Sequence, residues 1–272
     1  MLISLATAPN PGRVNEDFVV AGPGLVVVLD GAGLLVDLDT GCFHGVPWFV
    51  QRLGAELFGR ATRPEAELTD CLADAILAVS RLHAGSCDLG NPLTPSATVA
   101  IARARDELFE WLVLADSTLA LTLPDGVRTI SDHRVSQVTD EQRSAMAAEL
   151  RHLDRPQRLT ALVHAQRRVM NTPEGYWAAA SDPKAAAQAL TGSVPLSQVR
   201  TAALLTDGAA RAVDDFGLLS WPELLDRLEA TGPEGLIDFT RELERSDPDR
   251  LRWPRGKKHD DATAVLMRPQ ER

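Results

Sequence analysis

The sequence is short of cysteine and has no long apolar run, and both shortages exclude classes of protein. Cys42, Cys71 and Cys87 are an odd number without Cys-x-x-Cys spacing, which fits neither a disulfide framework nor a zinc site. No segment approaches the ~20 apolar residues that cross a bilayer, and the N-terminus has no basic start before an apolar stretch. We therefore expect a cytoplasmic protein with no membrane partner.

Basic residues are also in the minority. Lys and Arg number 28 against 38 Asp and Glu, which gives a formal net charge of −10. The densest basic runs, Arg167-Arg168 and Arg255-Gly256-Lys257-Lys258, are short. Because a negative surface repels a phosphate backbone, we expect no nucleic-acid partner. An acidic surplus commonly means only a well-solvated surface, but it also supplies carboxylates that can bind metal.

The 272 residues are rich in short apolar runs bounded by Gly, Pro or Asp, which predict β-strands. These runs are residues 2–6, 18–21, 25–29, 97–102, 108–114, 119–123, 202–205 and 262–267. Helical spacing predicts helices over 47–58, 64–84 and 234–245, a helical stretch from Ser131 and a helix from Pro183. Capping-box patterns at Thr139 and Ser220 predict two helix starts.

The order of these elements indicates the fold. No repeat, linker or low-complexity run divides the chain, so we expect a single domain over residues 1–272. Strands at both ends flank helices, with a helical insert at about residues 131–197. This order predicts an α+β sandwich with two sheets inside and helices outside.

Carboxylates stand where several of these strands begin or end. They are Asp30, Asp116 and Asp207 after apolar runs, and the pairs Glu16-Asp17 and Asp260-Asp261 before apolar runs. A single Asp-Gly after an apolar run is usually only a turn, so each case alone is weak. If the strands are neighbours, four or five carboxylates meet at one end of the sandwich and repel one another unless cations neutralise them.

The ligand type predicts the metal and the reaction. Oxygen ligands without nearby Cys or His favour Mg²⁺ or Mn²⁺ over zinc. Two such ions roughly 3.5–4 Å apart can share a water, lower its pKa and stabilise a transferring phosphoryl group. The residues therefore predict hydrolysis of a phosphate ester.

Taken in order, these motifs resemble those of the type 2C, metal-dependent (PPM) serine/threonine protein phosphatases, of the bacterial single-domain type. They are Arg13-Val14-Asn15-Glu16-Asp17, Asp30-Gly31-Ala32-Gly33, Ala115-Asp116-Ser117, Thr206-Asp207-Gly208 and Asp260-Asp261-Ala262-Thr263. The resemblance implies a four-layer α-β-β-α sandwich with two central, mostly antiparallel sheets and a variable flap at the helical insert. It also implies hydrolysis of phosphoserine and phosphothreonine on a phosphorylated protein substrate, without a phosphoenzyme.

The resemblance further implies which residues hold the metals. Asp30 would bridge two ions and Gly31 would offer its carbonyl oxygen to one of them. Asp207 and Asp260 would complete the coordination of the other ion. Asp116 matches the position that holds a third, looser metal in bacterial relatives.

Three more roles follow from the resemblance, together with two departures from it. Asp17 would act through a bound water with Glu16 beside it, and Arg13 would bind the substrate phosphate. Arg13 stands one residue closer to the acidic pair than the family arginine does. Ala32 lies where many relatives carry His or Met, so the proton for the leaving group would come from water or from another residue.

Two other functions remain open. A noncatalytic phosphatase-like domain, used for regulation or phosphopeptide binding, should have lost one of Asp30, Asp207 and Asp260, and all three are present. A phosphatase for small metabolites needs only different cleft walls. Cys42 and His44 have no second soft ligand at suitable spacing, so we expect them to be structural.

Overall fold

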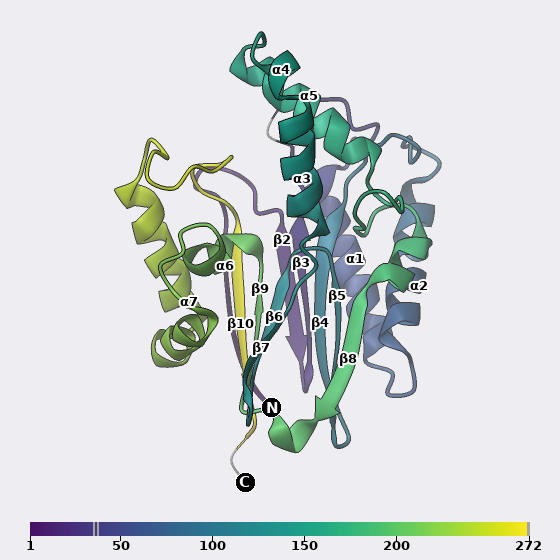
Figure 1. Cartoon of the computed structure of the whole chain (residues 1–272). Helices are drawn as coiled ribbons and strands as arrows, with labels where there is room; N and C mark the ends of the chain where they lie inside the picture. Colours follow the sequence, from purple (N-terminus) through teal and green to yellow (C-terminus); the bar gives the residue numbers. More distant parts are fainter. Residues whose placement is uncertain (35, 37, 271–272) are drawn as a thin grey trace.

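The computed structural model describes residues 1–34, 36 and 38–270. In these residues, two five-stranded sheets pack face to face and helices cover their outer faces (Figure 1). All the pairings between strands are antiparallel. The predicted α+β sandwich of four layers is therefore confirmed.

Each sheet draws its strands from distant parts of the chain. The first sheet has the order β1 (Leu2–Ala8), β10 (Ala262–Arg268), β9 (Thr201–Leu205), β6 (Thr118–Leu123) and β7 (Gly126–Ile130). The second has the order β2 (Asp17–Gly22), β3 (Leu25–Gly31), β4 (Ala97–Arg105), β5 (Leu108–Leu114) and β8 (Leu190–Pro195). The eight predicted strands are all present. The edge strands β7 and β8 were not predicted.

Apolar residues on both faces of the inner strands build three layers of core. Along β3, Leu25, Val27 and Leu29 face the helices beside the second sheet. The alternate residues Val26 and Val28 face the other sheet. Because successive side chains of a strand point to opposite faces, a strand between two apolar layers must be apolar throughout.

Two helix pairs cover the sheets. Helices α1 (Gly45–Ala61) and α2 (Leu68–His83) pack on the second sheet, and α6 (Asp207–Asp214) and α7 (Trp221–Ser246) pack on the first. The prediction that a helix begins at Pro64 was wrong, because α2 begins at Leu68. The capping box at Ser220 is confirmed, and Gly232 with φ of 74° kinks α7 ahead of Pro233.

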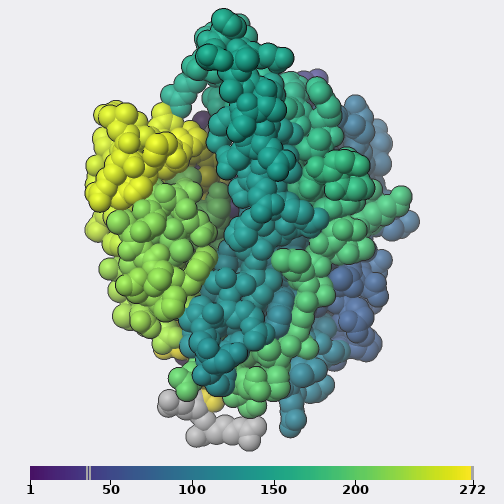
Figure 2. Space-filling model, in the orientation of Figure 1, coloured from purple at the N-terminus to yellow at the C-terminus, as the bar shows by residue number. Residues whose placement is uncertain are grey.

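The insert carries α3 (Arg134–Ala145), α4 (Ala147–Leu150) and α5 (Arg155–Arg168), which project beyond the sandwich (Figures 1 and 2). The 3-10 helices η1 (Pro183–Gln188) and η2 (Leu196–Gln198) flank β8, so the insert is not wholly helical. The predicted helix start at Thr139 was wrong: this residue lies inside α3 and its Oγ1 donates to the Val135 carbonyl oxygen. No helix in the described part of the chain is long and apolar enough to cross a membrane.

Candidate metal centre

The ends of the two sheets meet at Asp17. This residue opens β2 and is the register partner of Asp30 at the end of β3. From the other sheet, the hydroxyls of Thr206 and Thr263 donate to Oδ2 of Asp17 over 3.0 and 2.7 Å. Thr206 directly precedes Asp207, so these hydrogen bonds bring carboxylates from both sheets to one place.

One oxygen of Asp17 is left without a partner. Asp17 is 7% exposed, and its Oδ1 has no hydrogen-bond partner among the described residues. Burial raises the pKa of Asp17 to about 8, with further contributions from Asp207 and Asp261, although the two threonine hydroxyls oppose this shift. A buried carboxylate oxygen without a partner is costly, and a cation or an ordered water would satisfy it.

A cavity of about 230 Å³ holds three of the predicted aspartates. Asp30, Asp116 and Asp207 line it, together with Gly31 and Lys257. Burial, followed by the charges of neighbouring aspartates, raises the pKa of Asp30 well above its ordinary range. Burial and the charge of Asp207 raise the pKa of Asp116 to about 7. This crowding of carboxylates favours the binding of protons or cations.

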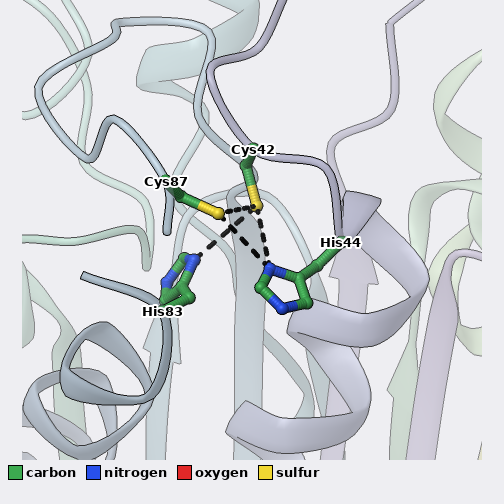
Figure 3. Close-up of side chains that lie close together, drawn as sticks. All are labelled: Cys42, His44, His83 and Cys87. Atoms are coloured by element: carbon green, nitrogen blue, oxygen red, sulfur yellow. Dashed lines mark hydrogen bonds between the residues drawn. The ribbon is translucent and has the colours of Figure 1, made fainter. Parts of the chain in front are cut away.

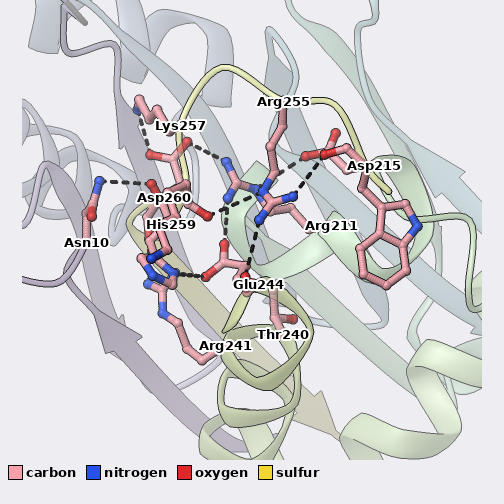
Figure 4. Close-up of polar contacts among 12 residues, drawn as sticks. Asn10, Arg211, Asp215, Thr240, Arg241, Glu244, Arg255, Lys257, His259 and Asp260 are labelled. Carbon is pink, nitrogen blue, oxygen red and sulfur yellow. Dashed lines mark hydrogen bonds and ion pairs between the residues drawn. The ribbon is translucent and has the colours of Figure 1, made fainter. Parts of the chain in front are cut away.

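Asp260 lies beside this cavity and both of its carboxylate oxygens are engaged (Figure 4). The ammonium of Lys257 donates to Oδ1 over 2.6 Å, and the guanidinium of Arg211 donates to Oδ2 over 3.0 Å. Arg211 also binds the fully buried Glu244, with an N–O distance of 2.5 Å. A network of buried charges therefore holds Asp260 in place.

Arg13 and Glu16 line a second cleft of about 320 Å³, together with Asp260 and Asp261. Arg13 is exposed and does not line the cavity that holds Asp30 and Asp207. Lys257 lines both the cavity and the cleft. All the predicted site residues except Asp17 thus line one of two adjoining spaces, and Lys257 lines both.

Two glycines of the Asp-Gly motifs are required by close backbone contacts. A Cβ at Gly208 would overlap the carbonyl oxygen of Asp261, and a Cβ at Gly31 would overlap that of Glu16. The carboxylate oxygens Oδ1 and Oδ2 of Asp261 accept hydrogen bonds from the backbone N–H groups of Asn10 and Glu16, over 2.7 and 3.2 Å. The Asp-Gly motifs therefore turn the chain and allow close backbone packing, and Asp261 holds the segment from Asn10 to Glu16 against the site.

Three cations of the site were missed in the sequence. In the sequence, Lys257 and Arg167 are notable only as members of short basic runs, and Arg211 has no basic neighbour. Arg167 is buried at the end of α5 and donates to the carbonyl oxygen of Ala32 over 2.6 Å. The spacing of Lys257, three residues before Asp260, is a signal that could have identified it.

The donor atoms of the cavity fit a hard divalent cation. Aspartate oxygens line it, with the backbone of Gly31 alongside, and no Cys or His lines it among the described residues. Oxygen donors of this kind suit Mg²⁺ and Mn²⁺. The unpartnered Oδ1 of Asp17 supports the same interpretation.

Comparisons with known proteins find a matching family and similar folds. Residues 11–243 match the model of the protein phosphatase 2C family. The fold is similar to that of the serine/threonine phosphatase Stp1 from Staphylococcus aureus, with a TM-score of 0.61 and 15% identity over 99% of this chain and 95% of that one. It is also similar to the serine/threonine phosphatase PstP/Ppp from Mycobacterium tuberculosis, with a TM-score of 0.58 and 18% identity over 97% of each chain.

A third similar structure is the catalytic domain of PstP in complex with two manganese ions. Its TM-score is 0.57, and it is 16% identical over 97% of this chain and 96% of that one. A comparison with curated proteins finds no match. At such low identities the structural likeness establishes the fold.

Proposed function

Because the chain belongs to the protein phosphatase 2C family of metal-dependent phosphatases, we propose that it hydrolyses phosphoserine and phosphothreonine on proteins. We propose two divalent cations, Mg²⁺ or Mn²⁺, as its cofactors. The observation that carries this proposal is the meeting of Asp17 and Asp30 of the second sheet with the start of α6, where Thr206 contacts Asp17 and precedes Asp207. An oxygen of Asp17 is buried and unpartnered there.

We assign the metal ligands from the residues at this meeting point. Asp30 and Asp207 line the cavity and Asp17 is buried next to them, so their carboxylates would hold the ions with the Gly31 carbonyl and Asp260. Asp116 lines the same cavity and is the candidate for a third ion. When bound, the cations would supply a nucleophilic water at neutral pH and neutralise charge on the phosphoryl group.

The chain's own cations would position the phosphate. Arg13 is exposed on the second cleft, and Lys257 lies between that cleft and the cavity. Two cations on adjoining walls can bind the oxygens of one phosphate and orient its ester bond. Ala32 has no side chain that donates a proton, so a water molecule would protonate the leaving oxygen. Glu16 lies on the second cleft, where it can orient such a water.

The insert is the proposed determinant of substrate choice. We propose that residues 1–272 form one phosphatase domain whose insert at about 131–197 acts as a flap. Val135, Val163 and Gln166 of α3 and α5 line the cavity, so the insert supplies one of its walls. Stp1 and PstP are described as serine/threonine phosphatases, which supports a phosphoprotein substrate.

The test is hydrolysis of p-nitrophenyl phosphate and of a phosphothreonine peptide by purified protein with Mn²⁺, Mg²⁺ or excess chelator. We expect turnover with either metal and none with chelator. Asp207→Asn should reduce kcat at least a hundredfold without loss of fold, because Asp207 is an exposed carboxylate at the start of α6. Asp226→Asn, an exposed aspartate of α7 outside both spaces, is the matched control.

Each result has a clear meaning. Metal-dependent turnover that Asp207→Asn abolishes and Asp226→Asn retains would establish the assignment. Wild-type turnover in Asp207→Asn would refute the ligand set. Inactivity with every metal would favour a noncatalytic phosphopeptide-binding domain, and activity on small esters alone would favour a metabolite phosphatase.

A further inference from the structure

Four soft side chains that can bind metal gather in one place (Figure 3), and none of them lines the cavity or the cleft of the carboxylate site. They are Cys42, His44, His83 and Cys87, and their ligand atoms all lie within 4.8 Å of one another. The sequence did not reveal this cluster, because Cys42 and His83 are 41 positions apart and no Cys-x-x-Cys spacing connects the cysteines. The premise that Cys42 and His44 have no further soft ligand at suitable spacing therefore does not hold in the folded chain, whereas the structural role expected for them stays a prediction.

We propose that this cluster is a structural zinc site with two cysteine and two histidine ligands. The proposal goes beyond the phosphatase reaction and does not depend on it. Zinc in such sites is tetrahedral, with bonds of about 2.3 Å to sulfur and about 2.0–2.1 Å to nitrogen.

The distances within the cluster suit that geometry. A tetrahedron with these bond lengths separates neighbouring ligand atoms by about 3.3–3.8 Å. Sγ of Cys42 lies 3.6 Å from Nδ1 of His44, 3.6 Å from Nδ1 of His83 and 3.4 Å from Sγ of Cys87. Sγ of Cys87 lies 3.3 Å from Nδ1 of His44. Four of the six distances between pairs of ligand atoms thus lie in the range expected for a zinc tetrahedron.

The chemistry of the ligands distinguishes this cluster from the carboxylate cavity. Thiolate and imidazole select zinc, whereas carboxylate oxygens select Mg²⁺ or Mn²⁺. Because four protein ligands complete a tetrahedron, no position remains for water or substrate. The inferred role is therefore structural.

Backbone contacts hold the two ligand-bearing segments together. The N–H of Asp88 donates to the carbonyl oxygen of Gly41 over 2.8 Å, which joins the loop of Cys42 to the loop of Cys87. The N–H of Cys87 donates to the carbonyl oxygen of His83 over 2.9 Å and closes the turn between these two ligands. A preformed arrangement of this kind lowers the ordering cost of binding a metal.

Aromatic rings fix the orientation of the histidines. The His44 ring is stacked between Phe43 and Trp48, at centroid distances of 4.0 and 4.1 Å. The Trp48 ring also lies 5.1 Å from that of His83. These contacts limit rotation of the two imidazole rings.

A metal here would join the two helices that cover the second sheet. His44 is the N-cap of α1, and His83 is the last residue of α2. Two residues beyond His44, the Val46 side chain lies against Gly31 of the candidate metal centre. Closing a loop of about forty residues removes conformational freedom from the unfolded chain, so zinc should stabilise this end of the domain.

The experiment measures zinc and cobalt binding by the full chain, purified without a metal-binding tag and under reducing conditions. We expect one zinc ion per chain after dialysis against a weak chelator. Cobalt exchanged into the site should give thiolate-to-metal charge-transfer absorption, which the carboxylate site cannot produce. Zinc should also raise the Tm by about 5–10 °C over the metal-free protein.

Variants assign the site to these residues. Cys87→Ser should lose the zinc ion and the charge-transfer absorption, and Cys87 is only half-buried, so the variant should still fold. Cys71→Ala, the matched control, removes the third cysteine from α2 and should retain both signals. Folding of each variant is checked by circular dichroism.

Three results would overturn the proposal. The first is a wild-type chain that gives no charge-transfer absorption with cobalt. The second is equal zinc content in Cys87→Ser and wild type. The third is a disulfide between Cys42 and Cys87 that persists in the protein purified under reducing conditions, seen as an intact mass lower by two hydrogens and assigned to this pair by peptide mapping.

Discussion

The ammonium of Lys257 lies 2.6 Å from Oδ1 of Asp260, at the edge of the candidate metal centre. Burial would lower the pKa of Lys257, but the charges of Asp260, Asp207 and Asp30 outweigh it and raise the pKa. In the absence of metal, the lysine therefore neutralises part of the carboxylate charge that a divalent cation would neutralise. The ammonium group therefore competes with the metal ions for these carboxylates.

The first prediction follows from this competition. Lys257→Gln should bind Mn²⁺ about tenfold more tightly, because removing one positive charge from among these carboxylates lowers the electrostatic cost of binding a divalent ion. Isothermal titration calorimetry measures the Kd, and Lys258→Gln, an exposed neighbour, is the control. Weaker binding in Lys257→Gln would mean that the lysine mainly orients Asp260.

The second prediction concerns Glu244 at the centre of the buried network. Its carboxylate is fully buried and contacts Arg211, Arg241 and His259 at 2.5, 2.8 and 2.6 Å. Glu244→Ala leaves two buried guanidinium groups without this partner, so the free energy of unfolding should fall by about 3–5 kcal/mol. Urea denaturation measures it, with Glu242→Ala, an exposed change in the same helix, as control. A loss as small as that of the control would contradict the role of the network.

The third prediction concerns Asp247 and pH. Its carboxylate accepts backbone hydrogen bonds from Leu251, Arg252 and Trp253, and the Arg255 guanidinium lies 2.8 Å away. Burial would raise the pKa of Asp247, but these hydrogen bonds outweigh it and lower the pKa from 3.8 to about 2. A depressed pKa stabilises the fold above the unfolded value, and this stabilisation is lost as pH falls through the folded value.

Wild type should therefore be more stable than Asp247→Asn at pH 5, and the difference should shrink as the pH falls from about 4 towards 2. Urea midpoints of both proteins at pH 5, 4 and 3 measure this. A difference in urea midpoint that stays constant over these three pH values would show that the charge of Asp247 does not contribute to stability.

Much of the fold could be predicted because inner strands are apolar on both faces. The run Leu25–Gly31 is readable as a strand between two apolar layers, and its carboxylate Asp30 stands out at the end. The edge strand β7, with the sequence Gly-Val-Arg-Thr-Ile, is exposed along most of its length and carries no such pattern. Thr139 failed as a helix start because a Ser/Thr-x-x-Glu/Gln pattern is also compatible with the interior of a helix.

The candidate site was predictable only as far as local motifs extend. Aspartates beside apolar runs are visible in the sequence, but Arg167 and Lys257 reach the cavity through tertiary packing that no local pattern encodes. The Cys42 cluster shows the same limit, since its partners His83 and Cys87 are joined to it by the packing of α1 against α2.

The last prediction concerns the link from the insert to the site. The buried guanidinium of Arg167 donates to the carbonyl oxygen of Ala32 over 2.6 Å and also bonds to Ser96. Arg167→Ala would remove the hydrogen bond that holds Ala32, the residue after Gly31. The value of kcat/KM on a phosphopeptide should therefore fall about tenfold, mostly through kcat. Arg167→Lys should recover part of the loss, and Arg168→Ala, an exposed neighbour, should match wild type. A lower Tm with unchanged kcat in Arg167→Ala would reduce the link to a purely structural one.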